Sequence, residues 1–359
     1  MISKLWIAAL AVRAVLALPP TPVEVAKRAT CTVSSAAAAA SVSSCSSVVI
    51  NAFTVSSGTT VDFKFASGAS VTMAGDITFS QTTSAGPLIT FEGTGVTFDG
   101  GGHKINGNGQ LYWDGEGTNG GVTKPHPFVK IKISGTFKNT VVYNSPAQAI
   151  SLGNSAALLI DSVTVDNSAG DAGALGHNTD GFDCSESDVT IQNCIVKNQD
   201  DCIAMNNGSN IKFLNNQCSG GHGISIGSIA SGKTVSGVTI SGNTVTNSMY
   251  GMRIKIDSDA TSGGVSDITY TGNTISGISK YGYLITQSYS DDFGTPGTDT
   301  TVTGISFTGA TTSISVNSTA YAVGVDCGNC SGTWNWASLV TSGGKGNDLV
   351  LDDATISGW

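Results

Sequence analysis

Charged and helix-forming residues are scarce in this chain. Only 12% of its 359 residues are Asp, Glu, Lys or Arg, 7% are aromatic, and 8 are proline. A coiled coil needs abundant Ala, Glu, Lys, Leu and Arg at helical spacing, and nothing here supplies that pattern. Disordered chains are poor in apolar residues, whereas 40% of this chain is hydrophobic. We therefore expect a folded protein that is not a coiled coil.

Basic clusters are also missing. The chain has 17 Lys and Arg against 26 Asp and Glu, a net charge of −9, and the basic residues form no run. A nucleic-acid binder normally shows a basic face, and a peripheral membrane protein needs a basic amphipathic stretch. We expect neither a nucleic-acid nor a membrane partner. The charge balance favours a soluble protein with a neutral or carbohydrate partner.

A short apolar run lies at the start of the chain. Residues 5–18 follow Lys4 and are too few to span a membrane, and no second span of that kind follows. Small residues near Ala17 suit signal cleavage, with a buried N-terminal helix as the alternative. We predict a secreted, extracellular protein with a net mature charge of −12, from 13 basic and 25 acidic residues. Its predicted parts are a signal peptide (1–17), a propeptide ending at Lys27-Arg28 (18–28) and one catalytic domain (29–359).

Eight cysteines fit an oxidising compartment, where an even number indicates disulfides. A zinc site would need paired short Cys spacings or nearby His. Only Cys327-x-x-Cys330 has such a spacing, and no second pair accompanies it, so a structural disulfide is favoured there. Three Asn-x-Ser/Thr triplets are candidate glycosylation sites in a secreted chain: Asn207, Asn317 and Asn329.

Beyond about residue 48, short β-branched runs alternate with Gly, Asn, Asp and Ser clusters, which predicts an all-β protein. One phrase recurs at intervals of 22 to 37 residues. Such a period indicates stacked coils that share one core; a β-sandwich needs no repeating phrase. We predict a single-domain right-handed parallel β-helix. The phrase begins at Ile160, Ile191, Phe213, Ile240, Tyr270 and Phe307.

Other residues are assigned by their place in these coils. The Ala- and Ser-rich residues 34–47 are expected to form a short N-terminal helix that caps the solenoid. Trp334 and Trp336 are candidates to cover the other end, with sugar stacking as the alternative. Repeated asparagines at the turns could adopt left-handed backbone and form side-chain ladders. These asparagines are Asn193, Asn216, Asn243 and Asn273.

Four short polar segments start 21, 23 and 32 residues apart, close to one coil each. Adjacent strands lie about 4.8 Å apart, so a solenoid would bring these segments into one patch. The segments are 177–181, 198–202, 221–223 and 253–255.

Strand alternation orients some of these side chains. Arg253 and Lys255 alternate with apolar residues and should share the outer face. Asp180, Asp201 and His222 each lie an even number of positions before the inward-facing apolar residues that follow them, so regular alternation would point them toward the core. We therefore expect these three at the starts of strands or in bulges, where alternation breaks.

Carboxylates grouped with His, Arg and Lys suit hydrolysis of an acidic sugar polymer. An inverting glycosidase uses an acid and a base about 6.5–9.5 Å apart, and crowded carboxylates raise at least one pKa. Arg and Lys would bind substrate carboxylates. Three Asp residues could instead hold calcium, but two nearby cations oppose it. We expect no metal and no cofactor.

These segments carry a resemblance to a known family. Asn178-Thr-Asp180, Asp200-Asp201, Gly221-His222-Gly223 and Arg253-Ile254-Lys255, in this order, resemble the signature segments of polygalacturonases, glycoside hydrolase family 28. The likeness covers essentially the whole mature chain and is strongest to secreted fungal endopolygalacturonases. It implies a right-handed parallel β-helix. The implied reaction is inverting hydrolysis of α-1,4 bonds between galacturonates in pectin or polygalacturonate.

The resemblance also implies residue roles. Asp200 would be the general acid, Asp180 and Asp201 would activate water, and His222 would influence the protonation of the acid. Implied substrate-binding residues are Asn178, Arg253, Lys255 and Tyr289. Implied disulfides are Cys31–Cys45, Cys202–Cys218 and Cys327–Cys330, while Cys184 and Cys194 either pair or remain free. We expect a monomer, with plant inhibitor proteins as candidate partners.

Three alternatives remain open from the sequence. An exopolygalacturonase would share the same motifs. A pectate lyase-like β-helix would act by β-elimination and need calcium, but the Asp200–Asp201 pair favours hydrolysis. A non-catalytic solenoid would bind pectin without releasing reducing ends.

Overall fold

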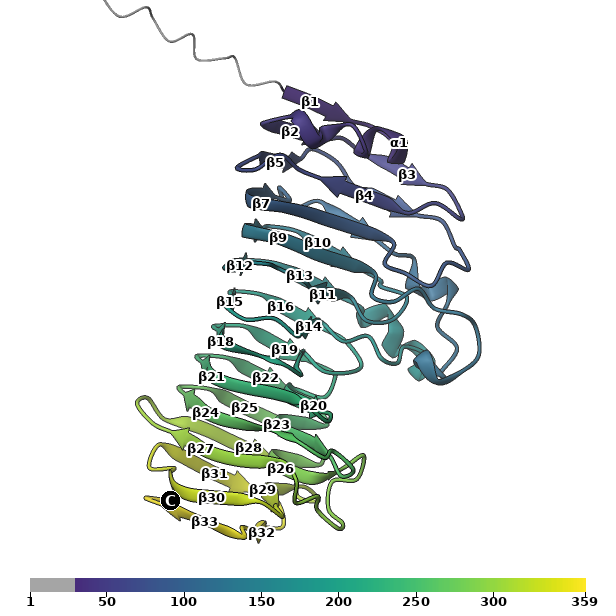
Figure 1. Cartoon of the computed structure of the whole chain (residues 1–359). Coiled ribbons are helices and arrows are strands. Elements are labelled where there is room, and N and C mark those ends of the chain that lie inside the picture. The colour runs from purple at the N-terminus through teal and green to yellow at the C-terminus, as the bar shows by residue number, and fades with distance from the viewer. Residues whose placement is uncertain (1–29) are drawn as a thin grey trace, which may run out of the picture.

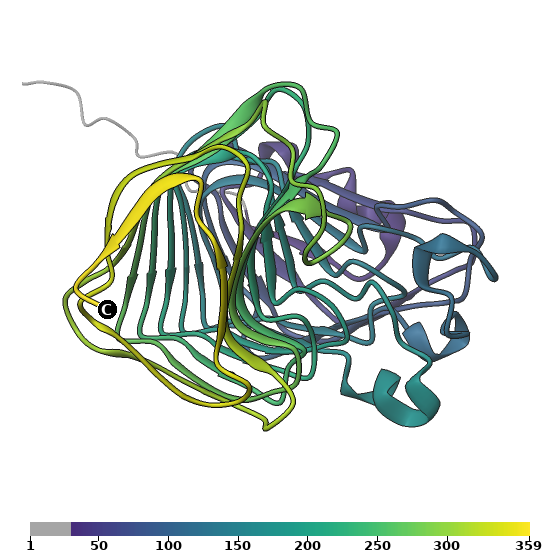
Figure 2. The ribbon, with the colours of Figure 1, turned by 90° about the horizontal axis from the view of Figure 1, so that it is seen from below.

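The computed structural model describes residues 30–359, so the predicted signal peptide and propeptide lie outside the described residues. Within that range the chain winds into coils that stack from one end to the other (Figure 1). Most coils contribute three short strands, and each strand pairs in parallel with its equivalent in the next coil. Figure 2 looks along the stack and shows the strands of successive coils lying behind one another. The predicted parallel β-helix is confirmed, with coil connections of the usual right-handed sense.

The strands fall into three rows, named here by their order within a coil. The first and second rows form the 22-stranded sheet and the third row forms the 11-stranded sheet. The first row is β4 (Val61–Lys64), β7 (Ile89–Asp99), β9 (Val129–Lys138), β11 (Ile150–Leu152), β14 (Phe182–Cys184), β17 (Ile203–Met205), β20 (Ile224–Ile229), β23 (Tyr250–Asp257), β26 (Tyr281–Tyr289), β29 (Tyr321–Asp326) and β32 (Asn347–Val350). The second row is β1 (Thr30–Val33), β2 (Ser47–Ile50), β5 (Ser70–Met73), β12 (Leu158–Asp161), β15 (Val189–Gln192), β18 (Gly208–Leu214), β21 (Lys233–Ser241), β24 (Gly263–Thr271), β27 (Thr301–Phe307), β30 (Cys330–Asn335) and β33 (Asp353–Ser357). The C-terminal halves of β7 and β9 also belong to this row, where they lie between β5 and β12. The third row is β3 (Phe53–Val55), β6 (Ile77–Phe79), β8 (Lys104–Asn106), β10 (Val141–Tyr143), β13 (Thr164–Asp166), β16 (Ile195–Lys197), β19 (Gln217–Ser219), β22 (Thr244–Thr246), β25 (Thr274–Ile278), β28 (Thr312–Val316) and β31 (Leu339–Gly343).

The repeated phrase of the sequence forms one column of the core. Its first residues lie opposite one another on successive second-row strands, beginning with Ile160 opposite Ile191 and ending with Tyr270 opposite Phe307. All are fully buried. The sequence period therefore gives the register between strands of successive coils, because each coil can bury its inward side chains only against its neighbours.

A buried asparagine ladder follows the second row. Asn216 Nδ2 donates to Asn243 Oδ1 (3.1 Å), and Asn243 Nδ2 donates to Asn273 Oδ1 (3.0 Å). The two parts of the prediction hold for different residues. Asn193 adopts the predicted left-handed backbone (φ 55°) but is exposed and lies outside the ladder, whereas the three ladder asparagines do not have a positive φ. The backbone N–H of Cys194, one residue later, donates to Asn216 instead. Within a coil, the left-handed turn position therefore comes one residue before the position that belongs to the ladder.

Both ends of the solenoid are covered. At the N-terminal end lie α1 (Ala36–Ala39), capped by the Ser35 hydroxyl, and the 3₁₀ turn η1 (Val42–Ser44), as the composition predicted. At the other end Trp334 and Trp336 are fully buried, and Trp336 Nε1 donates to the Ile305 carbonyl. Neither indole is free to stack on a sugar. Further 3₁₀ segments are η2 (Gly109–Leu111), η3 (Gly117–Asn119) and η4 (Ser168–Ala174).

Six of the eight cysteines are joined as the resemblance implied, in the pairs Cys31–Cys45, Cys202–Cys218 and Cys327–Cys330. Cys184 and Cys194 are both unpaired and buried, and burial raises their thiol pKa values to about 11 and about 12. Among residues 30–359, no helix has the length and apolar character needed to cross a bilayer.

The three predicted glycosylation sites differ in accessibility. Asn317 is exposed, whereas Asn207 and Asn329 are half-buried. The Nδ2 groups of the latter two donate to backbone carbonyls of Ser185 and Thr298. Because a glycan must attach to that nitrogen, Asn317 is the most accessible acceptor of the three.

Candidate active site

Three of the predicted site residues occupy equivalent places in successive coils. Asp180, Asp201 and His222 each lie two residues before a first-row strand, namely β14, β17 and β20. They therefore sit where strand alternation has not yet begun, as their parity predicted. Gly223 makes the turn possible: its φ is +73°, and a Cβ there would lie 2.2 Å from the Gly251 carbonyl oxygen.

The outward face of the first row supplies the partners of these residues. Ser225 on β20 lies opposite Arg253 on β23, and Lys255 follows two positions along the same strand. Alternation points all three away from the core, yet Arg253 is only 5% exposed and Lys255 only 7%. The carboxylate of Asp201 lies against both charged groups and leaves a small part of each exposed.

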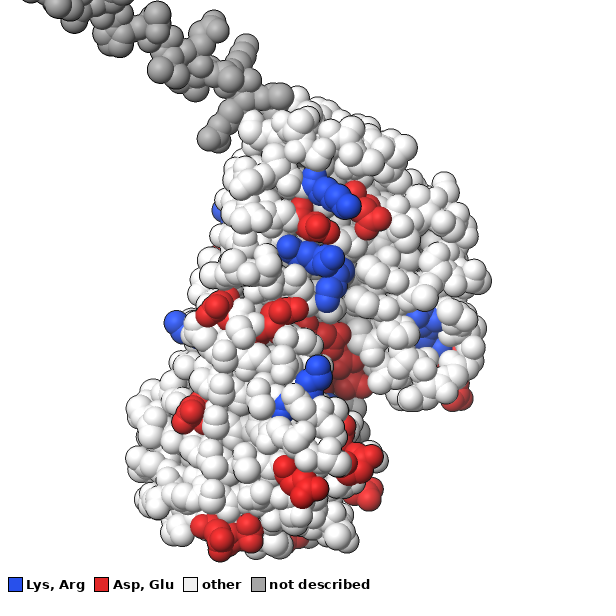
Figure 3. Space-filling model, viewed as in Figure 1, with Lys and Arg blue, Asp and Glu red and all other residues white. Residues whose placement is uncertain are grey.

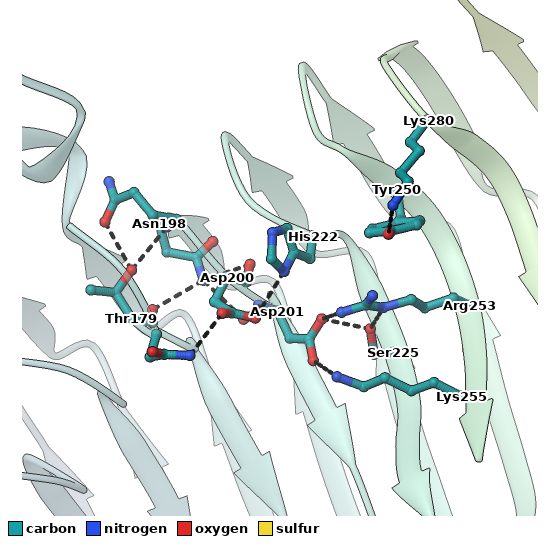
Figure 4. A network of polar contacts seen from close by, with 12 residues as sticks. Thr179, Asn198, Asp200, Asp201, His222, Ser225, Tyr250, Arg253, Lys255 and Lys280 are labelled. Atoms are coloured by element: carbon teal, nitrogen blue, oxygen red, sulfur yellow. Dashed lines mark hydrogen bonds and ion pairs between the residues drawn. The ribbon is translucent and has the colours of Figure 1, made fainter. Parts of the chain in front are cut away.

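Asp201 is held by two cations at once (Figure 4). Its Oδ1 accepts from Arg253 Nη2 at 2.7 Å and from the Ser225 hydroxyl at 2.6 Å. Its Oδ2 accepts from Lys255 Nζ at 2.7 Å. Burial alone would raise the pKa of Asp201, but the charges of Lys255 and Arg253 hold it well below its ordinary range. Asp201 is therefore a carboxylate with both oxygens engaged.

Asp200 lies beside this group and faces the groove, with its side chain 15% exposed. Its Oδ1 accepts the Asp201 backbone N–H at 2.8 Å and lies 3.0 Å from His222 Nδ1. Its Oδ2 accepts from Asn178 Nδ2 at 3.2 Å. Asn178 is oriented in turn by the backbone N–H of Thr118, which donates to its Oδ1. Contacts from three coils and one loop thus fix the Asp200 carboxyl.

Asp180 has a different environment. Its side chain makes no hydrogen bond within residues 30–359 and it is only 8% exposed. Burial, reinforced by the charge of Asp200, raises the pKa of Asp180 well above its ordinary value. The site therefore combines a carboxyl that binds its proton more tightly than usual with a carboxylate that is held ionised.

A fourth acid, Asp183, belongs to this cluster and was not among the predicted residues. It lies on β14, and burial, with the charges of Asp201 and Asp200, raises its pKa to about 7. The alternation of Phe182, Asp183 and Cys184 places it on the outward face, which is the signal that could have revealed it. Ser225 was also missed and carries the same signal.

Aromatic rings flank the two cations. The Arg253 guanidinium lies 4.3 Å from the centre of the Tyr250 ring, and Lys255 Nζ lies 5.1 Å from that of Tyr289. The structure thus places the predicted residue Tyr289 beside Lys255. The Tyr250 hydroxyl donates to Asp292 Oδ1 and accepts from Lys280 Nζ. These contacts fix Tyr250 and, through its ring, one face of Arg253.

The acids lie in a hollow of the surface, where Figure 3 shows a concentration of red atoms. A cavity of about 740 Å³ opens on the His222 side of Asp200. Its lining includes His177, Gln199, His222 and Met249. His222, which contacts Asp200, forms part of the cavity wall.

A divalent cation does not fit this donor set well. Asp200, Asp201 and His222 each offer one atom within 4.8 Å of the others. Both oxygens of Asp201, however, already face Arg253 and Lys255 at 2.7 Å. A metal ion would have to displace or approach these two positive charges.

Stacked coils that carry a carboxylate cluster beside paired cations on one face fit a glycoside hydrolase. Residues 45–352 match the family described as Glycosyl hydrolases family 28, and the chain belongs to this family.

Known relatives support this assignment across the chain. Endopolygalacturonase I of Aspergillus aculeatus is 43% identical over 338 residues, which cover 91% of this chain and 89% of that protein. A polygalacturonase of Cochliobolus carbonum is 44% identical over 317 residues, covering 86% of each. The solved structure of endopolygalacturonase I from Stereum purpureum, complexed with two galacturonate, matches with a TM-score of 0.90 at 60% identity. That match covers 91% of this chain and 98% of the other, and it confirms the right-handed β-helix and the polygalacturonase resemblance.

Proposed function

We propose that this protein is an endopolygalacturonase that hydrolyses α-1,4 bonds between galacturonates in pectin or polygalacturonate, with inversion. The observation that carries the proposal is the cluster itself. Asp180, Asp200 and Asp201 meet Arg253 and Lys255 in one groove, although the chain separates the first and last by 75 positions. The family and the endopolygalacturonase relatives support the same reaction.

Asp200 is the general acid in this proposal. It faces the groove, and His222 and Asn178 hold it from opposite sides, which directs one carboxyl oxygen toward the leaving glycosidic oxygen. His222 Nδ1 lies within hydrogen-bond distance of Asp200, so it can return a proton to the acid after each turnover. This places His222 beside the acid rather than in contact with the anomeric carbon.

Asp201 and Asp180 act on the water. Asp201 remains ionised because of its two cations, so it can accept a hydrogen bond from a water molecule at the opposite side of the bond. Asp180 positions the same water, and its raised pKa makes it the stronger proton acceptor of the two acids. Attack from the side opposite the leaving group inverts the anomeric centre.

Arg253 and Lys255 bind a substrate carboxylate in addition to Asp201. A guanidinium has five N–H donors and an ammonium has three. The contacts to Asp201 and Ser225 use two donors of Arg253, and the contact to Asp201 uses one of Lys255. The remaining donors are available to a galacturonate carboxylate, and Tyr289 lies beside them for contact with the sugar.

The test is a product profile from polygalacturonate over time, with the anomer of the first product read by NMR. An inverting endopolygalacturonase lowers viscosity quickly, gives mixed oligomers, and releases the β-anomer first. Release of monomer alone would indicate exo attack. Unsaturated ends that vanish with a chelator would indicate a lyase, and pectin binding without new reducing ends would indicate a binding module.

Secretion after removal of residues 1–28 is part of the proposal, as are a monomeric state and recognition by plant inhibitor proteins. The three disulfides support an oxidising compartment. N-terminal sequencing of the protein from culture medium should begin at Ala29. A start at Met1, or retention inside the cell, would contradict this part.

A further inference from the structure

The segment 198–202 contains a buried amide that the proposed reaction does not use. Asn198 comes directly after β16 and is only 2% exposed. Its Nδ2 lies within hydrogen-bond distance of three backbone carbonyls, those of Thr179 (3.0 Å), Asp200 (3.0 Å) and Asp201 (2.9 Å) (Figure 4). An amide NH₂ group has two hydrogens, so at least one of them is shared between two carbonyls. One buried side chain therefore contacts the backbone of two neighbouring coils, each of which carries acids of the site.

The Thr179 carbonyl depends on this amide. Thr179 directly precedes Asp180, and within residues 30–359 its carbonyl accepts a hydrogen bond from Asn198 alone. The two carbonyls of the acid pair, by contrast, also accept backbone N–H groups from neighbouring coils. Loss of the Asn198 amide would therefore release the turn before Asp180, while the backbone ladder between the coils would remain.

A second contact joins the same two turns. The Gln199 backbone N–H donates to the Thr179 hydroxyl at 2.9 Å, and that hydroxyl donates to Gln199 Oε1 at 2.8 Å. Gln199 Nε2 donates in turn to the Asn167 carbonyl and to Asp171 on η4. Both turns are thus tied to each other and to the loop beside them. We call Asn198, Thr179 and Gln199 the inter-coil brace.

The inter-coil brace lies where the separation of the acids is decided. Asp180 follows Thr179 in the chain, and Asp200 follows Gln199. The Asp180 side chain makes no hydrogen bond within residues 30–359, so its position relative to Asp200 depends on the turns that the brace connects. In an inverting glycosidase the acid and the base must leave room for a water molecule. Such a constellation tolerates displacements of only about 0.5 Å.

We propose that Asn198 is a positioning residue, which sets the separation between Asp180 and the Asp200–Asp201 pair with the support of the other two members of the inter-coil brace. This inference rests on the proposed function, in which these carboxyls act on two sides of one glycosidic bond. The Asn198 amide is buried and faces three carbonyls, so it acts on the reaction through the acids and not through the substrate. Its loss slows the chemical step and leaves substrate binding by the two cations, two coils further on, in place.

The test variant is Asn198→Ala, and the chain offers a matched control one coil earlier. Asn167 occupies the equivalent position, because Asp166 and Lys197, the residues that precede the two asparagines, lie opposite each other. Asn167 is fully buried and holds Ser145 through both of its side-chain polar atoms, at 2.7 and 2.8 Å. Asn167→Ala therefore removes a buried turn amide whose side chain touches no acid.

We expect Asn198→Ala to lower kcat on polygalacturonate by up to about 100-fold, the usual size for reacting groups misplaced by about 1 Å. KM should change little, because the ground-state contacts of the substrate carboxylate remain. Asn167→Ala should lower the melting temperature by a similar amount and keep the parent kcat. Both variants are assayed well below their melting temperatures. A parent kcat in Asn198→Ala, or an equal fall of kcat in Asn167→Ala, would overturn the proposal.

Crystal structures of both variants test the geometry without turnover. In Asn198→Ala the distance between the carboxyls of Asp180 and Asp200 should change by more than about 0.5 Å, and in Asn167→Ala it should not. If the parent hydrolyses polygalacturonate but this distance is the same in parent and Asn198→Ala, only the present inference is refuted. If the parent does not hydrolyse it and the distance still changes, the proposed reaction is refuted and the positioning role stands.

Thr179→Val is the second variant if Asn198→Ala fails to fold. Valine is close in shape to threonine, and it removes both hydroxyl contacts to Gln199. We expect a loss of kcat at little-changed KM, smaller than that for Asn198→Ala because the Asn198 contacts remain. An unchanged kcat in Thr179→Val would then count against the inter-coil brace.

Discussion

Lys255 Nζ lies 2.7 Å from Oδ2 of Asp201, a residue 54 positions earlier in the chain and two coils away. Arg253 meets the other oxygen of the same carboxylate at the same distance. The cations therefore do two things: they keep a buried acid ionised and present their remaining donors to the groove. A substitution at either cation should affect folding as well as substrate binding.

For Arg253→Ala we expect a higher KM and a lower melting temperature. The substrate loses a carboxylate contact, and Asp201 loses one of its two compensating charges in a buried site. Removing one partner of a buried ion pair typically costs about 3–5 kcal/mol of stability. Steady-state kinetics and thermal denaturation measure the two effects. Arg253→Lys, which keeps the charge, is the control, and an unaltered KM in the alanine variant would refute substrate contact.

For Asp200→Asn we expect turnover to fall by about 10²–10⁴-fold, the usual contribution of general acid catalysis. The amide is nearly isosteric, and its single oxygen can still accept the Asp201 backbone N–H, while the contact from Asn178 to the other carboxyl oxygen is lost. The melting temperature and the affinity for oligomers should therefore change little. Reducing-end assays and calorimetry provide the two measurements. A variant with the parent rate would exclude Asp200 as the acid.

Asp183 should make the fold less stable as pH rises. Its pKa of about 7 in the folded protein exceeds the ordinary 3.8, so the folded state binds the proton more tightly than the unfolded state. The stabilisation that Asp183 adds to the free energy of unfolding is complete below about pH 4 and is lost as the pH rises through 7. Asp183→Asn should therefore gain stability over the parent progressively between pH 4 and 7.

Urea denaturation of the parent and of Asp183→Asn across that range tests the prediction. Asp180 contributes with the same sign and remains in both proteins, but the charge of Asp183 helps to raise the pKa of Asp180, so the difference reports Asp183 together with its effect on Asp180. A stability difference that stays constant from pH 4 to pH 8 would show that the pKa of Asp183 is not raised.

For Asn243→Ala we expect the free energy of unfolding to fall by about 1–3 kcal/mol for each polar group left without a partner in the core. Asn243 is only 1% exposed and bonds to Asn216, Asn273 and the Phe213 carbonyl. Asn347→Ala is the control, because Asn347 is exposed and its side chain makes no hydrogen bond within residues 30–359. Equal denaturation midpoints for the two variants would mean that the ladder adds nothing to stability.

Much of the architecture was determined by the sequence alone. The recurring phrase from Ile160 to Phe307 set the coil period, because every coil must bury its inward residues against the next. The order and spacing of the motifs placed Asp180, Asp201 and His222 in successive coils. Their parity placed them ahead of the strands. The Ala-rich segment and the two tryptophans predicted which residues cover the two ends of the solenoid.

Side-chain pairing was decided only by the tertiary structure. The engagement of Arg253 and Lys255 by Asp201, and the membership of Asp183 in the acid cluster, depend on burial and on contacts across several coils. The contact from Thr118 to Asn178 joins positions 60 residues apart through a loop. Periodicity tells which coil and which face a residue occupies. It does not tell how much water reaches the residue or which neighbour it meets, and these two quantities set its charge and its chemistry.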